Sequence, residues 1–128
     1  MKRKKLTASM IALVMSVSLP MTTYAANWYL EDGSVTVNAD NSGQTVTQGG
    51  TSTPDEAPVI TQRGESSVET GNTIAINASD NATANVTIKD INIKSSNDAI
   101  DVKGSSSANI TLEGDNKIFS ESGSALHV

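Results

Sequence analysis

The sequence predicts an all-β solenoid, in which short strands form coils of about 24–26 residues that stack on one another. The first observation behind this prediction is that residues 84–88 (ANVTI) return as residues 108–112 (ANITL) after 24 positions. The second is that residues 99–102 (AIDV) return as residues 125–128 (ALHV) after 26 positions. The third is that apolar and polar side chains alternate within each copy, which is typical of half-buried strands.

The first full copy of the repeat contains three expected strands, each reading apolar–polar–apolar: residues 86–88, 91–93 and 100–102. Small polar residues and glycine separate them, as the corners of a coil require. Stacking the next copy would place Val86 under Ile110 and Ile100 under Leu126, so that equivalent strands pair in parallel and form an apolar ladder. An antiparallel β-sandwich is the alternative, because strands spaced 8–12 residues apart also suggest one. A sandwich, however, has no reason to repeat at this period.

One stretch resembles coils of right-handed parallel β-helix proteins of the pectin-lyase-like fold. It consists of residues 97–102, then Gly104 and Ser105, and then residues 108–112. The leader segment, the Ser/Thr/Asn-rich coils and the low aromatic content resemble secreted surface proteins of Gram-positive bacteria, some of which are labelled carbohydrate-binding. The resemblance covers about residues 57–128. It implies a right-handed parallel β-helix there and specifies no activity.

Residues 1–25 are predicted to be a signal peptide. Basic residues at positions 2–5 precede a short apolar stretch, and Thr23 and Ala25 supply the small side chains that a signal peptidase reads. The apolar stretch is shorter than the roughly 20 residues that a membrane-spanning helix needs. The mature chain is therefore expected to begin at Ala26 and to be secreted or displayed at the cell surface.

The net charge and the cysteine content limit the classes of partner and metal site that can be expected for this chain. The chain has 9 basic and 14 acidic residues, and the leader holds four of the basic ones, so the mature chain has 5 against 14, a net charge of −9. Such a surface repels phosphate backbones and anionic lipid, so neither nucleic acid nor an anionic membrane is expected as a partner. Cysteine is absent, which excludes disulfides and thiolate metal sites.

The mature chain divides into an N-terminal cap strand and flexible loop at residues 26–56, and β-helix coils at residues 57–128. Trp28 and Tyr29 are adjacent in the expected strand, so they point to opposite faces and do not form one sugar-stacking platform. One of them is expected to cover the open bottom of the first coil. Residues 38–56 are expected to be a loop, with a brief strand near Gln44, because they contain few apolar side chains.

Residues 57–83 are expected to form a first, irregular coil, since residues 74–76 lie 26 positions before residues 100–102. At the other end, the repeat is in mid-coil at Val128. The β-helix is therefore expected to be incomplete in this chain and to continue beyond that residue.

No catalytic residue is predicted. Asp98 and Asp101 have some similarity to the acidic segments of polygalacturonase-like hydrolases, but they are three positions apart and face differently in a strand unless a corner intervenes. His127 occupies an outward strand position, and Arg63 is expected in a turn. The acids are therefore interpreted as corner and surface residues, and the chain as a non-enzyme.

No metal site and no cofactor are predicted, and the binding residues stay unassigned. Carboxylates that suit Ca²⁺ are scattered rather than gathered in a known loop: Asp80, Asp90, Asp98, Asp101 and Asp115. Four Asn-x-Ser/Thr matches are attributed to the Asn/Thr-rich composition: Asn77, Asn81, Asn85 and Asn109. Asn85 and Asn109 are instead expected to stack as a ladder at a coil corner.

The function expected from these features is a secreted or cell-surface β-solenoid that acts as a binding, adhesion or spacer module, with carbohydrate as the candidate ligand. Its partners would be glycans or the host or cell-wall surface, together with further copies of the chain associating end to end through the open coil. The alternative is the N-terminal part of a polysaccharide lyase or glycoside hydrolase of the pectin-lyase-like fold. Downstream coils with clustered Asp, His and Arg would favour that alternative.

Overall fold

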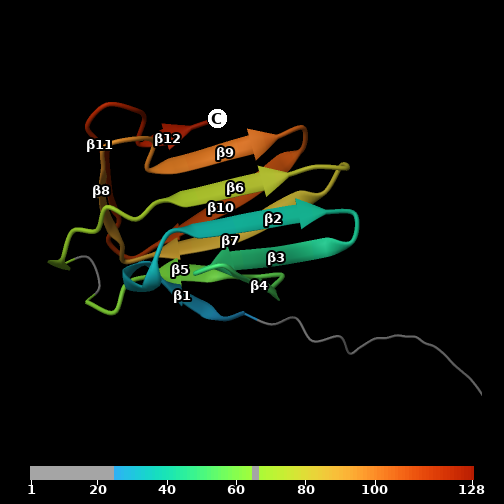
Figure 1. The fold of residues 1–128 in the computed structure, drawn as a ribbon, viewed down its shortest axis with the longest axis horizontal. Helices are drawn as coiled ribbons and strands as arrows, with labels where there is room; N and C mark the ends of the chain where they lie inside the picture. Colours follow the sequence, from blue (N-terminus) through green and yellow to red (C-terminus); the bar gives the residue numbers. More distant parts are fainter. Residues whose placement is uncertain (1–24, 65–66) are drawn as a thin grey trace, which may run out of the picture.

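The computed structural model describes residues 25–64 and 67–128, and within them the chain is an all-β protein, as predicted (Figure 1). The regular elements that can be bounded within these described residues are a 3₁₀ turn, η1 (Leu30–Asp32), and twelve strands. In chain order they are β1 (Asn27–Tyr29), β2 (Val35–Asp40), β3 (Gly43–Gln48), β4 (Thr51–Pro54), β5 (Val59–Thr61), β6 (Ile74–Ala78), β7 (Thr83–Lys89), β8 (Asn92–Ser95), β9 (Ile100–Gly104), β10 (Ser107–Glu113), β11 (Lys117–Ser120) and β12 (Leu126–His127).

The strands form three sheets around one core. A four-stranded sheet has the order β1-β5-β7-β10 and is parallel throughout. A six-stranded sheet has the order β12-β9-β6-β2-β3-β4, parallel from β12 to β2 and antiparallel beyond it. The parallel pair β11-β8 lies at one side, between the six-stranded sheet in front and the four-stranded sheet behind (Figure 1).

The register expected from the repeat is confirmed. Val86 pairs with Ile110, and Ile100 pairs with Leu126. Residues 74–76 pair with residues 100–102, as the 26-residue spacing predicted. Antiparallel pairing is confined, among the described residues, to β2-β3-β4, and the other strand pairs are parallel.

Residues 38–56 were expected to be a loop with a brief strand near Gln44. The strand is confirmed as β3, but the rest of the segment completes β2 and forms β4. The composition misled because β3 has only one apolar residue, Val46, yet its polar Gln44 is buried on the same face, and β2 offers an edge on which β3 pairs. Gly49 and Gly50 form a two-residue hairpin turn with φ of 61° and 81°, values that favour glycine. Val46, at the centre of β3, is fully buried.

The segment expected to be an N-terminal cap strand forms two strands, and each pairs with a later strand of the chain. β1 pairs in parallel with β5, and β2 pairs in parallel with β6. These two strands therefore form a further layer of parallel strands next to those of residues 57–78. Trp28 packs against the core, while its neighbour Tyr29 lies on the outer face, as strand alternation predicted.

The core is the apolar ladder predicted from the repeat. Ile88 and Ile93 are fully buried, and Ile100 is 3% exposed. Ile110 is only partly buried and Leu112 is 59% exposed, because both lie on β10 at the edge of the four-stranded sheet. The outward residue Thr87 is half-buried, so the two faces of β7 differ as expected.

Buried polar side chains complete the hydrogen bonding where strands are too short to do so. The Gln44 side chain is 3% exposed, donates from Nε2 to the Asn85 carbonyl at 3.0 Å and accepts from the Asn85 amide at 2.8 Å. It therefore serves β7 as a neighbouring strand would. Gln62 acts similarly, donating to the Val68 carbonyl and accepting from the Asn92 amide.

The predicted signal peptide lies almost entirely outside the described residues. In residues 25–64 and 67–128, no helix is long and apolar enough to cross a membrane.

Candidate binding groove

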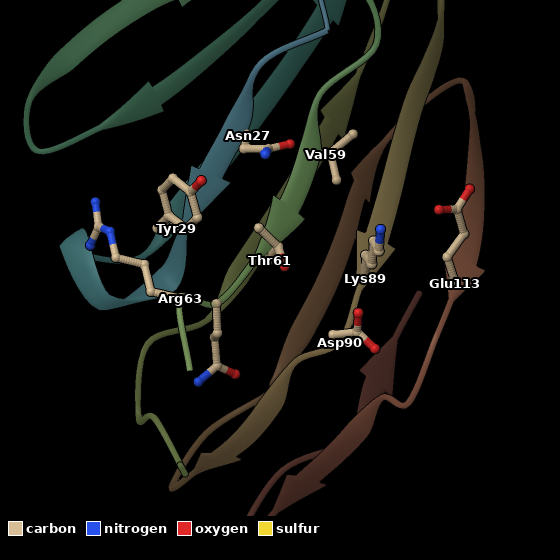
Figure 2. A pocket seen from close by; sticks show the side chains of 9 residues that line it. Asn27, Tyr29, Val59, Thr61, Arg63, Lys89, Asp90 and Glu113 are labelled. Atoms are coloured by element: carbon tan, nitrogen blue, oxygen red, sulfur yellow. The ribbon is translucent and has the colours of Figure 1, made fainter. Parts of the chain in front are cut away.

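The candidate site is an open hollow of about 500 Å³ on the outer face of the sheet β1-β5-β7-β10 (Figure 2). Its side chains come from all four strands and from the turns that follow them. Polar groups predominate in it. We call it the groove and define it by six residues: Tyr29, Thr61, Arg63, Lys89, Asp90 and Glu113.

Parallel, in-register pairing places one outward side chain from each strand at the same level. Tyr29 pairs with Thr61, and Lys89 pairs with Glu113. Ile60 pairs with Ile88, so the residues that follow them, Thr61 and Lys89, also lie level. Because neighbouring strands lie about 4.8 Å apart, this row of four side chains extends about 14 Å across the sheet.

Tyr29 and Arg63 form one wall of the groove (Figure 2). The Arg63 guanidinium carbon lies 4.3 Å from the centre of the Tyr29 ring, within the range of a cation–π contact. Two hydrogen bonds to Asp32, of 2.9 Å and 2.7 Å, hold the guanidinium in this position. They lower the pKa of Asp32 and raise the pKa of Arg63. The turn η1 supplies Asp32 directly after β1, so one short segment positions both partners of Arg63.

Lys89 and Glu113 form the opposite wall (Figure 2). Neither makes an ion pair within the part of the chain that the structure describes. Lys89 thereby differs from the other four basic groups there, Arg63, Lys94, Lys103 and Lys117, each of which is paired with a carboxylate. An ammonium group and a carboxylate group are therefore free to contact a ligand.

Asp90 lies at the end of the groove, and its carboxylate forms a hydrogen bond within the fold. It occupies a corner with φ of 53°, and its Oδ1 accepts a hydrogen bond of 2.9 Å from the amide of Asp115. Gly114 makes room for that carboxylate, since an added Cβ would lie 2.0 Å from Asp90 Oδ1. Asp90 thus holds one corner to the equivalent corner 25 residues later, as the interpretation of the acids as corner residues predicted.

A second polar cluster, which the sequence did not predict, lies at the start of β9. Asp98 precedes this strand at a corner, and the corner lets its carboxylate approach that of Asp101. His127 pairs in register with Asp101, and its Nδ1 lies 3.0 Å from Asp101 Oδ1 and 3.7 Å from Asp98 Oδ2. One ligand atom from each of the three side chains lies within 4.8 Å of the others, so together they could coordinate a divalent cation.

Ion pairs already link the members of this second cluster. The hydrogen bond with Asp101 raises the pKa of His127, and the charge of Asp98 adds to the effect. The same bond, with a further one from Lys103, lowers the pKa of Asp101. Asp98 Oδ1 also accepts a hydrogen bond of 2.7 Å from the Ser124 amide. These contacts of Asp98 and Asp101 with His127 and the Ser124 amide therefore connect the beginning of β9 to β12 and the turn before it.

The other residues singled out from the sequence lie outside the groove, in strands or turns. Asn85 and Asn109 do stack, with Asn109 Nδ2 donating to Asn85 Oδ1 at 3.1 Å, although they lie within β7 and β10 rather than at a corner. Asn77 forms a similar rung with Asn38 at 2.9 Å. Asp80 lies in a turn with φ of 56° and does not belong to the cluster of Asp98, Asp101 and His127.

The sequence reasoning missed the groove as a unit. In the sequence Tyr29 is adjacent to Trp28, whereas its neighbours in space come from strands far along the chain. Aligning the short strand at 27–29 with 59–61 and 87–89 would have found the row, because the third residue of each faces outward. The irregular spacing of these strands concealed that alignment.

Among known proteins, no family model, no curated protein and no solved structure matches this chain.

Proposed function

We propose that this chain is a right-handed parallel β-helix that acts as a secreted or cell-surface carbohydrate-binding module, and that the groove holds the glycan. The parallel pairing of equivalent strands supports the solenoid. Connections between parallel strands of one sheet are right-handed in about 98% of cases, which supports the handedness. The predicted signal peptide supports export, and an adhesion or spacer role is compatible with the same surface.

The observation that carries the proposal is the row of outward side chains from Tyr29 through Thr61 and Lys89 to Glu113. The hollow above it is open along the sheet face, so a chain-like ligand can cross several strands. A deep, closed and mostly apolar pocket would instead favour a small molecule.

The chemistry of the row favours sugars over other polymers. A sugar hydroxyl both donates and accepts hydrogen bonds, and the groove offers hydroxyl, ammonium and carboxylate groups side by side. Tyr29 adds an aromatic surface with a polar end, on which the C–H face of a sugar ring can pack. A phosphate polymer would meet Glu113 and Asp90 here and a net charge of −9 on the mature chain.

Binding to a panel of bacterial, plant and host polysaccharides, measured by affinity electrophoresis and calorimetry, tests the proposal. Lys89→Ala should weaken binding of the positive glycan about tenfold, a loss of about 1.4 kcal/mol, because Lys89 is free to contact it. The matched control is Lys117→Ala, which removes an exposed lysine paired with Asp115 outside the groove and should leave affinity unchanged. Equal effects of the two substitutions, or no binding to any glycan, would reject the groove.

The alternative function, a polysaccharide lyase or hydrolase, can be tested with the same protein and glycan samples. Incubation with polygalacturonate and the other glycans should release no new reducing ends or unsaturated products. Activity that disappears in Asp98→Asn or Asp101→Asn would overturn the binding proposal in favour of an enzyme.

End-to-end association with further copies also stays a proposal. Exposed apolar side chains on the last three strands support it: Leu112, Phe119 and Leu126. Sedimentation at several protein concentrations should reveal a mass that rises with concentration, and a constant monomer mass would exclude it.

A further inference from the structure

Asp55, between β4 and β5, is a buried carboxylate with three hydrogen-bond donors. Its residue is 1% exposed. Oδ2 accepts from the backbone nitrogen of Ala26 at 3.1 Å and from the Trp28 indole at 2.8 Å. Oδ1 accepts from the Ala57 amide at 3.0 Å. Asp55 therefore ties the beginning of β1 to the beginning of β5.

Within residues 25–64 and 67–128, no positive side chain accompanies this carboxylate. No lysine, arginine or histidine among the described residues forms an ion pair with Asp55. All three of its donors are neutral as long as Ala26 belongs to an uninterrupted peptide chain. A buried carboxylate is costly unless a positive group accompanies it.

The sequence places a cut at this same nitrogen. Thr23 and Ala25 are the small residues that predict signal-peptidase cleavage between Ala25 and Ala26. Hydrolysis breaks the bond between the Ala25 carbonyl carbon and the Ala26 nitrogen and consumes one water. The Ala25 carbon receives the hydroxyl group and leaves as a carboxylate, and the Ala26 nitrogen becomes an amine. With an ordinary pKa of about 7.7–8.0, that amine is mostly an ammonium at neutral pH.

We propose that the α-ammonium group of Ala26, created by removal of the signal peptide, is the counter-ion of buried Asp55. Cleavage then converts a neutral hydrogen bond into a charge-assisted one at a site that is already formed. The processed chain is thereby more stable than the same chain with its N-terminus extended, because cleavage strengthens the existing link between the beginning of β1 and the beginning of β5. This inference depends on the predicted cleavage site and not on the carbohydrate groove.

The first test compares exported, purified chains by thermal unfolding. One alanine inserted between Ala25 and Ala26 lets the peptidase cut before the inserted residue, so that Ala26 keeps a neutral amide and the ammonium moves one residue away. Intact mass identifies the first residue of each chain. The insertion should lower Tm by at least about 4 °C in the native background. In the Asp55→Asn background, where one of the two acceptor oxygens stays and the negative charge is gone, it should change Tm little.

The second test does not use a substitution of Asp55, so it remains possible if Asp55→Asn does not fold. An ion-paired amine has a raised pKa, and one unit leaves about tenfold less reactive free amine at neutral pH. The α-amine of the processed chain should therefore react with an acylating reagent about tenfold more slowly than that of the insertion variant. Trp28→Phe, which keeps an aromatic ring but removes the indole donor together with part of the side-chain bulk, should preserve this protection.

Three results would overturn the inference. They are equal acylation rates for the two chains, an insertion effect on Tm that is the same with Asp55→Asn, and a natural chain that begins at a residue other than Ala26. A failure of glycan binding would leave all three measurements unaffected, so the two proposals fail separately.

Discussion

Residues 83–128 and residues 27–78 are stacked in the same parallel way but are held together differently. In residues 83–128, equivalent strands lie 24–26 positions apart, and acids at the corners bond to the next copy, as Asp98 does to the Ser124 amide. In residues 27–78, Asn27 pairs with Val59, an offset of 32, and Val35 pairs with Ile74, an offset of 39. Buried polar side chains such as Gln44 and Asp55 make up for the irregularity.

The difference shows that a stack of strands can continue where its period in the sequence has disappeared. The hairpin β3-β4 is inserted after β2, so it lengthens the connection between layers without changing the pairing of β2 with β6. The backbone pairing depends on strand register and not on the length of the connections. Substitutions made in each region separately should therefore show whether different interactions hold the two regions together.

The largest expected effect is in the shared core. Ile88→Ala should cost about 2–5 kcal/mol of unfolding free energy, because Ile88 is fully buried between layers. Ile110→Ala should cost less, since Ile110 is only partly buried on β10. Urea denaturation measures both, and Thr111→Ala is the outward control, expected within about 0.5 kcal/mol of the native chain. Equal losses at Ile88 and Thr111 would mean that the two faces are wrongly assigned.

A smaller effect is expected where backbones approach closely. Gly104 has φ of 110°, and an added Cβ would lie 2.0 Å from the Ala78 carbonyl oxygen in the neighbouring strand. Gly104→Ala should therefore cost about 1–3 kcal/mol from crowding, in addition to the cost of its backbone conformation. Gly50→Ala is the matched control, with φ of 81° and no atom within 4 Å of the added Cβ. Similar losses of unfolding free energy in the two variants would show that the close approach contributes nothing.

Gln44→Leu tests the irregular region and should cost about 1 kcal/mol. The leucine keeps the side-chain bulk but leaves the Asn85 amide and carbonyl without the two bonds that Gln44 provides. Hydrogen exchange of the Asn85 amide should accelerate in this variant. An unchanged exchange rate would indicate that Gln44 does not replace a strand beside β7.

The smallest effect is a titration in the regular region. His127 is the one histidine of the chain, so NMR follows it without overlap. The bond with Asp101 raises the pKa of His127, so the ion pair stabilises the fold below the ordinary histidine pKa and is lost as pH rises through the raised value. It is lost again at acid pH, when pH falls through the lowered pKa of Asp101. Asp101→Asn should bring the His127 pKa back down, and an unchanged titration would remove this link between β9 and β12.

The sequence predicted the all-β class and the register of residues 74–128, because inward residues such as Ile100 and Leu126 recur at a nearly constant spacing. It did not predict the layer formed by β1 and β2, since the hairpin after β2 breaks the spacing. It also treated Asp98, Asp101 and His127 as separate surface residues, although the register that pairs His127 with Asp101 was available. Asp55 carried no signal at all, because its burial follows from the folding of Ala26 and Trp28 around it.

The repeated segments of the sequence form strands that pair in parallel and in register. A double variant, Thr87→Cys with Thr111→Cys, tests this pairing in a chain that has no other cysteine. The two positions pair directly on β7 and β10, and strands about 4.8 Å apart bring their Cα atoms within the range of a disulfide. Mild oxidation followed by intact mass should show complete cross-linking of this pair. Thr87→Cys with Leu112→Cys, one residue out of register and on the opposite face, should stay reduced. Cross-linking of the second pair in place of the first would contradict the stacked arrangement.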